Sequence, residues 1–443
     1  MLSMMKLTLR TVLFAVAALW MGGRAGAQSA QPLSLADCRA RALAHSEDLK
    51  QAGNRVSQAE LDVKIAAAAA LPKFDASAVG AYVAPDIDML GMELRMRGMY
   101  MADLNLTQPL YAGGKIRAGR RLARIGKDVA LEQQRMTRMD VLVEADQTYW
   151  TCVAVRGKVR MLERYAAQMD TLYRQTETAC AAGMATANDL LRIEAKRSEI
   201  RYQLQKARSG AELCRLSLCR VVGAESGALL EPSDTLPEAA PPSGLTADLA
   251  ARPELRMLEK QVEAGGQQVR MARSDMLPTV GLTADYTYYG NIKLHTPGAG
   301  GDSPVPASTQ EFRDDLGAVM LAVRIPLFHW GENRRKVRRA QLDEENARLD
   351  LQKNRRQLQL EAEQAVRNVS DGYALVETAR TGLRQAEANL RDMQNRYAAA
   401  LSPLTDLLDA QSLWQQAQSN LIEALTQYKI YETEYLRATG RLE

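Results

Sequence analysis

The sequence of 443 residues contains two copies of one unit, and this repeat constrains the fold more than any other feature. Leu49 aligns with Leu255 at an offset of 206, and Asp189 aligns with Asp406 at an offset of 217. The offsets differ by 11, so a single insertion separates the aligned blocks. We place it at 291–310, a stretch rich in Gly, Pro and Ser that predicts an enlarged surface loop. Both halves are therefore expected to adopt the same fold.

The N-terminal segment has the three parts of a secretory signal peptide in order. Lys6 and Arg10 precede an apolar run over 11–21, and a small-residue cleavage site follows at 25–27. We therefore predict that residues 1–27 are a signal peptide. Its removal takes away three basic residues, so the net charge falls from +4 to +1. This charge excludes a basic nucleic-acid-binding protein.

Three histidines and five cysteines leave little material for a metal centre or a catalytic site. The histidines are scattered without metal-ligand spacing, and the sequence shows no nucleophile paired with a base. We expect a protein that is not an enzyme and that has no cofactor and no metal. We interpret the cysteines as small apolar packing residues, and whether any of them pair stays open. They are Cys38, Cys152, Cys180, Cys214 and Cys219.

Each copy has the same order of predicted elements. The first copy spans 28–223 and the second spans 249–443, with a proline-rich linker at 224–248. In the first copy we predict helices at 33–70, 115–182 and 187–222, with strands at 73–83 and 99–108. In the second copy we predict helices at 252–276, 332–399 and 404–439, with strands at 279–289 and 316–325. The predicted turns from strand to long helix contain Pro109, Gly113, Gly114, Pro326 and Gly331.

The two long helical segments contain no proline and are rich in Ala, Gln and Arg. A helix of this length is a rod of about 100 Å, at about 1.5 Å per residue. Such helices pair as coiled coils instead of folding back into a globule. We therefore predict a mainly α fold with a small β part, in which two tandem repeats each form a long helical hairpin.

The predicted strands alternate apolar and polar residues, as the strands of outer-membrane barrels do. Phe74 and Tyr82 share the apolar face of the first strand and lie about 27 Å apart at about 3.4 Å per residue. This separation suits two aromatic girdles around an apolar band, and we assign Tyr286 and Tyr288 of the second copy to them. A half-buried soluble sheet is the alternative explanation of the alternation.

The number of strands limits how they can cross a membrane. Four strands cannot close a transmembrane barrel, for which about eight is the minimum. Lipid also tolerates no open sheet edges. We therefore expect several chains to share one barrel.

Several segments together resemble the TolC family of outer-membrane efflux and secretion channels. They are LSLADCRARALAHSEDLK, ARPELRMLEKQVEAGGQQVRMARSDMLPTVGL, the turns QPLYAGGK and IPLFHWGENRRKV, ATANDLL, and YAAALSPLTDLLDAQSLW. The resemblance implies a homotrimer in the outer membrane of a diderm bacterium. Its twelve-stranded barrel would contact lipid, and its helices would form a tunnel through the periplasm. It would be a passive exit duct for an inner-membrane pump and a periplasmic adaptor, in efflux or in type I secretion.

The resemblance also implies a gate near the helical hairpin ends, where family members close with aspartate rings and links between helix pairs. The matching residues are Asp189, Tyr397, Asp406 and Asp409, with Asn188 in place of a hydroxyl residue. Ser402 stands where one prominent member has arginine, so the expected links are a Tyr397–Asp189 hydrogen bond and an Asn188–Asp409 contact. The resemblance assigns adaptor docking to the hairpin tips: Gly183, Met184, Ala185, Thr186, Ala400, Leu401, Ser402 and Pro403.

Two other classes of protein stay open on sequence alone. A periplasmic adaptor also has a helical hairpin, but it would normally have one hairpin and a lipoyl-like β domain. A soluble coiled-coil scaffold would have the helices but would leave the four alternating strands unexplained.

Overall fold

The computed structural model describes residues 31–89, 92–235, 239–298, 306–399 and 401–443. The predicted signal peptide at 1–27 lies outside the described residues. Among the helices described, none has an apolar stretch long enough to cross a membrane.

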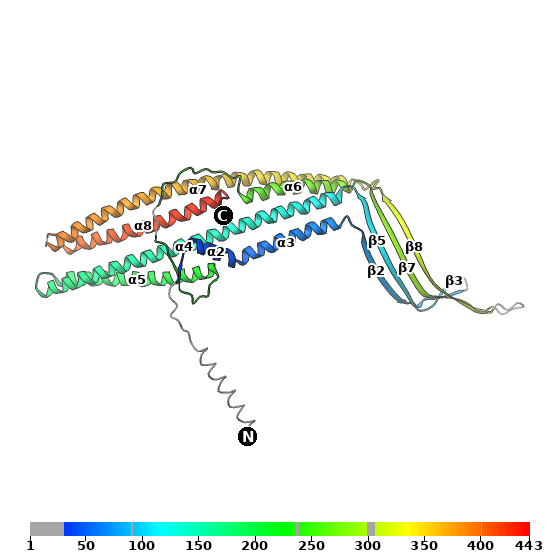
Figure 1. Ribbon diagram of the computed structural model, residues 1–443, viewed down its shortest axis with the longest axis horizontal. Helices are drawn as coiled ribbons and strands as arrows, with labels where there is room; N and C mark the ends of the chain where they lie inside the picture. Colours follow the sequence, from blue (N-terminus) through cyan, green and yellow to red (C-terminus); the bar gives the residue numbers. More distant parts are fainter. Residues whose placement is uncertain (1–30, 90–91, 236–238, 299–305, 400) are drawn as a thin grey trace, which may run out of the picture. The chain divides into compact units, whose positions relative to one another are not determined.

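The helices follow the order of the two copies (Figure 1). The first copy contains α2 (Leu35–His45), α3 (Glu47–Ala68), α4 (Lys115–Ala181) and α5 (Ala187–Val222). The second contains α6 (Pro253–Ser274), α7 (Glu332–Ala398) and α8 (Leu404–Ala438).

The helix expected over 33–70 is two helices, because two serine side chains cap them separately. The Oγ atom of Ser34 accepts a hydrogen bond from the Asp37 amide at 3.1 Å. The Oγ atom of Ser46 accepts one from the Leu49 amide at 3.2 Å. Each bond satisfies an amide that has no partner within the first turn of a helix.

Equivalent glycines end the return helix of each copy. Gly223 and Gly440, 217 residues apart, have φ angles of 67° and 71°. A Cβ atom would lie 2.5 Å from the His45 ring at Gly223 and 2.5 Å from the Ala251 carbonyl at Gly440. Only glycine combines this conformation with this close approach. The repeat is therefore visible in packing as well as in sequence.

Four long antiparallel strands form most of one sheet, in the order β2-β5-β7-β8 (Figure 1). They are β2 (Lys73–Tyr82), β5 (Arg97–Ala112), β7 (Thr279–Thr296) and β8 (Ser308–Arg324). A short hairpin of β3 (Ile87–Met89) and β4 (Met92–Arg95) adds to the sheet, where β4 pairs with β7. Within the described residues, β2 pairs only with β5 and β8 pairs only with β7.

The prediction of a loop over 291–310 is wrong at both ends of that stretch, and its middle part, 299–305, lies outside the described residues. The strand β7 continues to Thr296 and β8 starts at Ser308, with Ile292 opposite Phe312 and Leu294 opposite Gln310. These β-branched and apolar side chains favour a paired strand, and this preference outweighs the Gly/Pro-rich composition of the stretch as a whole. The prediction of four strands also omitted β3 and β4, and it ended the long strands too early.

The predicted strand-to-helix turns are partly misplaced. Pro109 lies inside β5, where the pairing with β7 shifts register between Pro109 and Tyr111. A proline is tolerated in a sheet at such an irregularity, because the backbone there need not donate to the ladder. Gly113 and Gly114 do form the turn into α4, with φ angles of 58° and 87°. Pro326 follows β8, and Gly331, with φ of 77°, precedes α7.

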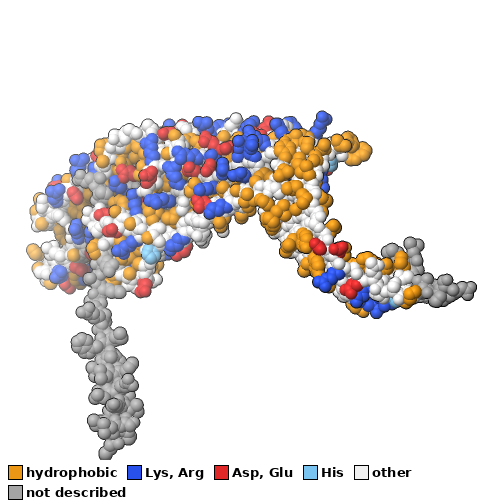
Figure 2. Space-filling view, turned by 45° about the vertical axis from the view of Figure 1, so that its right-hand side comes forward, with side chains coloured by type: hydrophobic (Ala, Val, Ile, Leu, Met, Phe, Trp, Pro, Cys, Tyr) orange, Lys and Arg blue, Asp and Glu red, His pale blue; other side chains and the backbone are white. Residues whose placement is uncertain are grey.

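The sheet has one polar and one apolar face. On the polar face, Asn105 donates to Asp285, and Thr287 donates to Asp103 at 2.7 Å. On the apolar face, Phe74 and Val319 are 77% and 75% exposed. Figure 2 shows hydrophobic side chains gathered over the strands, whereas Lys and Arg side chains are frequent along the helices. Such a continuous apolar surface marks a site that contacts lipid or another apolar partner.

The predicted aromatic girdles do not align as expected. Phe74 pairs with Leu106, whose partner in β7 is Ala284. Tyr286 and Tyr288 lie two and four residues farther along β7, so they fall between the level of Phe74 and that of Tyr82. The cross-strand register decides this level, and the sequence of a single strand does not contain it.

The chain forms two compact units, and each unit combines parts of both copies. One consists of the residues up to Lys50, Met136–Arg252 and Gln357–Glu443, and the other of Gln51–Arg135 and Pro253–Arg356. These units cut across the predicted copies 28–223 and 249–443. The reason is that elements of the two copies pack on one another, as β5 does on β7. The linker predicted at 224–248 contributes β6 (Leu230–Pro232), which pairs in parallel with β1 (Gln31–Leu33).

A buried carboxylate joins three helices of the first unit. Asp146 on α4 is 0% exposed, and Arg39 on α2 donates to its two oxygens at 2.7 and 2.6 Å. Thr433 on α8 donates to the same carboxylate at 2.7 Å. A bidentate arginine–carboxylate pair fixes both the distance between the two side chains and their relative orientation.

Replacement of this carboxylate should destabilise the protein strongly. Asp146→Asn leaves Arg39 without its counter-charge, and we expect a loss of about 3 kcal/mol in the free energy of unfolding. Denaturant unfolding in detergent, followed by circular dichroism, measures this loss. The control is Glu163→Gln, which removes an exposed partner of Arg208 and should cost less than about 1 kcal/mol. Equal effects of the two substitutions would contradict the assignment.

Candidate functional site

The first hairpin ends in a tight turn between α4 and α5. The amide of Met184 donates to the Ala179 carbonyl at 2.8 Å, and the amide of Gly183 donates to Cys180 at 3.0 Å. Gly183 has a φ of 72°, as expected for the residue that ends a helix in this hydrogen-bond pattern. The turn leaves the side chain of Met184 79% exposed.

A reciprocal capping box starts α5 directly after this turn. Thr186 Oγ1 accepts a hydrogen bond from the Asp189 amide at 3.2 Å, and Asp189 Oδ2 accepts one from the Thr186 amide at 3.2 Å. The Thr186 hydroxyl also donates to Asp189 Oδ2 at 2.7 Å. These hydrogen bonds of Asp189 thus fix the backbone conformation at the start of α5.

The second hairpin end repeats the tight turn of the first but not its capping box. The amide of Leu401 donates to the Arg396 carbonyl at 2.8 Å, over the same spacing as from Met184 to Ala179. Leu401 is the counterpart of Met184 at the offset of 217, and it is 77% exposed. The helix α8 then starts after Pro403, whose side chain makes no cap. Ala400, a predicted tip residue, lies outside the described residues.

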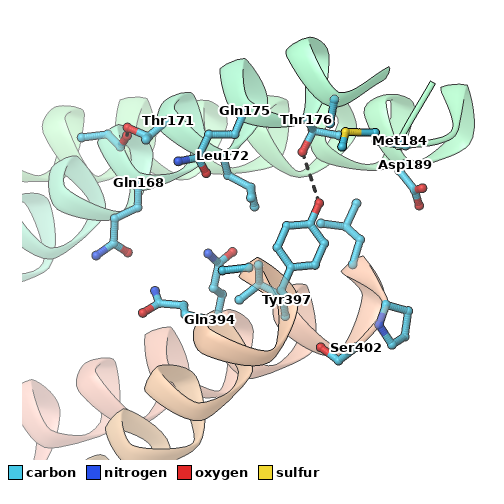
Figure 3. Close-up of a pocket in the computed structure, with 18 residues that line it drawn as sticks. Gln168, Thr171, Leu172, Gln175, Thr176, Met184, Asp189, Gln394, Tyr397 and Ser402 are labelled. Carbon is cyan, nitrogen blue, oxygen red and sulfur yellow. Dashed lines mark hydrogen bonds between the residues drawn. The ribbon is translucent and has the colours of Figure 1, made fainter. Parts of the chain in front are cut away.

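A groove of about 940 Å³ lies between the two hairpin ends of one chain (Figure 3). The tyrosine of the predicted gate points across it: the Tyr397 hydroxyl lies 3.5 Å from Thr176 Oγ1. Thr176 is 1% exposed and Tyr397 is half-buried, so this polar contact is partly shielded from solvent. Gln411 Oε1 and Ser402 Oγ are buried at the groove without a hydrogen-bond partner. Polar side chains from both hairpins therefore meet in this groove.

An apolar cluster under the groove holds the hairpins together. It contains residues of α4, α5, α7 and α8, and Leu404 and Leu407 on the first turns of α8 are 4% and 3% exposed. Asp406 and Asp409 alternate with these leucines and are exposed. They are three residues apart, so they share one helix face that points away from the core.

The structure brings together only part of the predicted gate. Tyr397 and Asp189 line the same groove, but Tyr397 contacts Thr176, and Asp189 caps Thr186. Asn188 is exposed, as Asp406 and Asp409 are, and these three lie outside the groove lining. Sequence reasoning missed the role of Thr176, for which the sequence contains no signal. The Thr186-to-Asp189 spacing of a capping box was a signal that could have been used.

Comparison with known proteins identifies the family. The sequence profile described as "Outer membrane efflux protein" matches residues 39–224 and 245–441, most of both copies. This chain belongs to the outer membrane efflux protein family. Members of this family are outer-membrane efflux channels and not enzymes. The protein is therefore an outer-membrane protein of a Gram-negative bacterium that extends into the periplasm.

Individual relatives of this efflux protein are distant in sequence. The outer membrane efflux protein BepC of Brucella suis is 23% identical over 341 residues, which are 76% of this chain and 72% of BepC. The outer membrane protein TolC of Escherichia coli is 23% identical over 362 residues, 77% of this chain and 69% of TolC. The crystal structure of VceC from Vibrio cholerae has a TM-score of 0.75 at 21% identity and covers 92% of this chain and 96% of VceC. This last likeness shows the fold.

Loss of the capping box should loosen the first hairpin end. In Asp189→Ala, the Thr186 amide loses its acceptor, at a cost of about 1 kcal/mol, so this amide should exchange about fivefold faster with deuterium. Hydrogen exchange followed by mass spectrometry measures this. Asn188→Ala is the matched control, because Asn188 is exposed and adjacent. An unchanged exchange rate in Asp189→Ala would contradict the capping role.

Proposed function

We propose that this protein is the exit duct of a tripartite efflux or type I secretion system. Three copies would form one channel that passively conducts substrates from an inner-membrane pump and a periplasmic adaptor to the exterior. The observation that carries the proposal is the sheet with one apolar exposed face and two edge strands, β2 and β8, each of which has one strand partner within the described residues. It occurs in a chain of the outer membrane efflux protein family.

Assembly of several chains would satisfy the edges of the sheet. The outer edges of β2 and β8 present backbone groups that lipid cannot hydrogen-bond. Pairing of β8 with β2 of the next copy would remove both edges at every junction. With four long strands from each chain, three chains would give a closed twelve-stranded barrel. The polar face that contains Asp103 and Asp285 would then line the lumen, and the face that contains Phe74 would contact lipid.

The hairpin ends would form the periplasmic entrance. In a trimer, Asp406 and Asp409 would bring two carboxylates from each chain to one constriction, because both are exposed on the same face of α8. A ring of carboxylates attracts cations. The Tyr397–Thr176 contact and the capping box of Asp189 would hold the hairpins of each chain in the resting position.

The hairpin tips would bind the adaptor. The first tip contains Gly183, Ala185 and Thr186 beside exposed Met184, and the second contains Ser402 and Pro403 beside exposed Leu401. Two exposed apolar side chains at equivalent positions, surrounded by small residues, suit contact with another protein's apolar helical tip.

A conductance measurement tests the proposed channel and its gate. The full chain, purified from outer membranes and reconstituted in a planar bilayer, should conduct and should prefer cations over anions. In Asp406→Ala with Asp409→Ala, the cation preference should fall severalfold, because the ring of carboxylates is removed. The reversal potential in a salt gradient measures this preference.

The matched control is Glu423→Ala, which removes an exposed carboxylate from the same helix but far from the hairpin end. Absence of any conductance would reject the channel. An unchanged reversal potential in the double variant would reject the carboxylate ring and leave the channel standing.

A further inference from the structure

Four of the five cysteines gather at one place in the first unit. Cys38, Cys152 and Cys219 belong to one buried cluster, and Cys214 packs against it. They come from three helices, namely α2, α4 and α5. The fifth, Cys180, lies at the hairpin end of α4. A group of thiols in an exported protein needs a chemical account, because the periplasm favours disulfides.

Two of these thiols, one on each helix of the first hairpin, are in direct contact. Cys152 Sγ on α4 donates to the backbone carbonyl of Cys214 on α5 at 3.1 Å, and the Cys152 side chain is also close enough to influence the Cys214 thiol. A disulfide requires the Cα atoms of the two cysteines to lie within about 7 Å, and the contact of Cys152 with the Cys214 backbone brings the two residues near this range. Formation of the disulfide requires the Cys152 side chain to turn from the Cys214 carbonyl toward the Cys214 sulfur.

The pair also has access and a suitable nucleophile. Cys152 is 3% exposed, but it lines a cavity of about 190 Å³ together with Arg156 and Arg215. Cys214 is half-buried and therefore the more accessible thiol. The neighbouring Cys152 thiol lowers the pKa of Cys214 to about 7, which favours the Cys214 thiolate. The pKa of Cys152 is raised by the Cys214 thiol and by burial.

We propose that Cys152 and Cys214 form a disulfide that joins α4 to α5 in the exported protein. The oxidant is a protein disulfide of the periplasm. The Cys214 thiolate attacks one sulfur of that disulfide, which forms a mixed disulfide and releases a thiolate from the oxidant. Cys152 then loses its proton and attacks Cys214 Sγ, which breaks the mixed disulfide and releases the second oxidant thiol. Two electrons and two protons pass from the cysteine pair to the oxidant.

The other two clustered cysteines are less suited to this reaction. Burial, and then the neighbouring Asp146 carboxylate, raise the pKa of Cys38 to about 12, so it stays protonated. Cys219 Sγ lies 3.6 Å from the Ala228 carbonyl and accepts from the Arg215 guanidinium at 3.7 Å, which turns it toward the segment after α5. Both therefore remain packing residues.

The disulfide would divide the first hairpin into two parts. It closes a loop of 61 residues that contains the whole hairpin end. The part packed around Asp146 and the cysteine cluster would be covalently fixed. The end that contains Asp189 would keep its freedom to move, because no other covalent link would hold it.

Thiol counting on the full chain tests the disulfide. Cells that express the protein are treated with acid, which stops thiol–disulfide exchange. The protein is then denatured at neutral pH, with or without reduction, and its free thiols are labelled with N-ethylmaleimide. The unreduced wild type should take three labels and the reduced protein five. Trypsin places Cys152, Cys214, Cys219 and Cys38 in separate peptides, so the unreduced digest should contain 139–156 linked to 209–215.

Three variants complete the test. Cys152→Ser and Cys214→Ser should each take four labels whether or not they are reduced. The matched control, Cys180→Ser, should take two labels unreduced and four after reduction. Five labels on the unreduced wild type would overturn the proposal, and so would a digest in which Cys152 is linked to Cys38. Because labelling follows denaturation, poor folding of a variant does not obscure the result for the wild type.

Discussion

The constraint on which the rest of this structure depends is the hydrogen-bonding demand of a sheet edge next to lipid. Within the described residues, β2 and β8 each have one strand partner, and the face that contains Phe74 and Val319 is apolar and exposed. A sheet with this surface and these edges is not stable alone in lipid, because unpaired backbone groups there cost several kcal/mol each. The proposal that several chains share one barrel rests on this constraint. In the proposed trimer, the coiled helices continue the same assembly away from the membrane.

In the first unit, a buried ion pair and close backbone packing hold the helices together. The Asp146 carboxylate receives Arg39 and Thr433, so α2, α4 and α8 meet at one buried charge. Equivalent glycines at 223 and 440 close the return helices tightly against the start of each copy. At the hairpin ends, an apolar cluster and one long contact between two hydroxyl groups join the hairpins, and no buried ion pair is found among the described residues there. A gate at these ends would therefore have to open against apolar packing and without breaking a buried charge pair.

The sequence predicted the class of fold because two strong patterns carry it. Proline-free helical segments and alternating strands, repeated twice, indicate long helices and a small sheet, and the structure has both. The level of Tyr286 and Tyr288 could not be predicted, because cross-strand register is a property of pairing between strands far apart in sequence. The strands at 279–289 and 316–325 were predicted, but their extension to Thr296 and Ser308 was missed, because composition describes a whole stretch, whereas pairing depends on individual residues such as Ile292 and Phe312. At the site, Tyr397 was found through the resemblance, but its partner Thr176 is 221 residues away and carries no local signal.

The most direct test of the account is the native mass of the protein extracted in detergent from purified outer membranes. Native mass spectrometry, or light scattering corrected for bound detergent, gives the number of chains in the particle. The account predicts three chains, since three sets of four long strands close one barrel. A particle of one or two chains would contradict the shared barrel and with it the proposed channel.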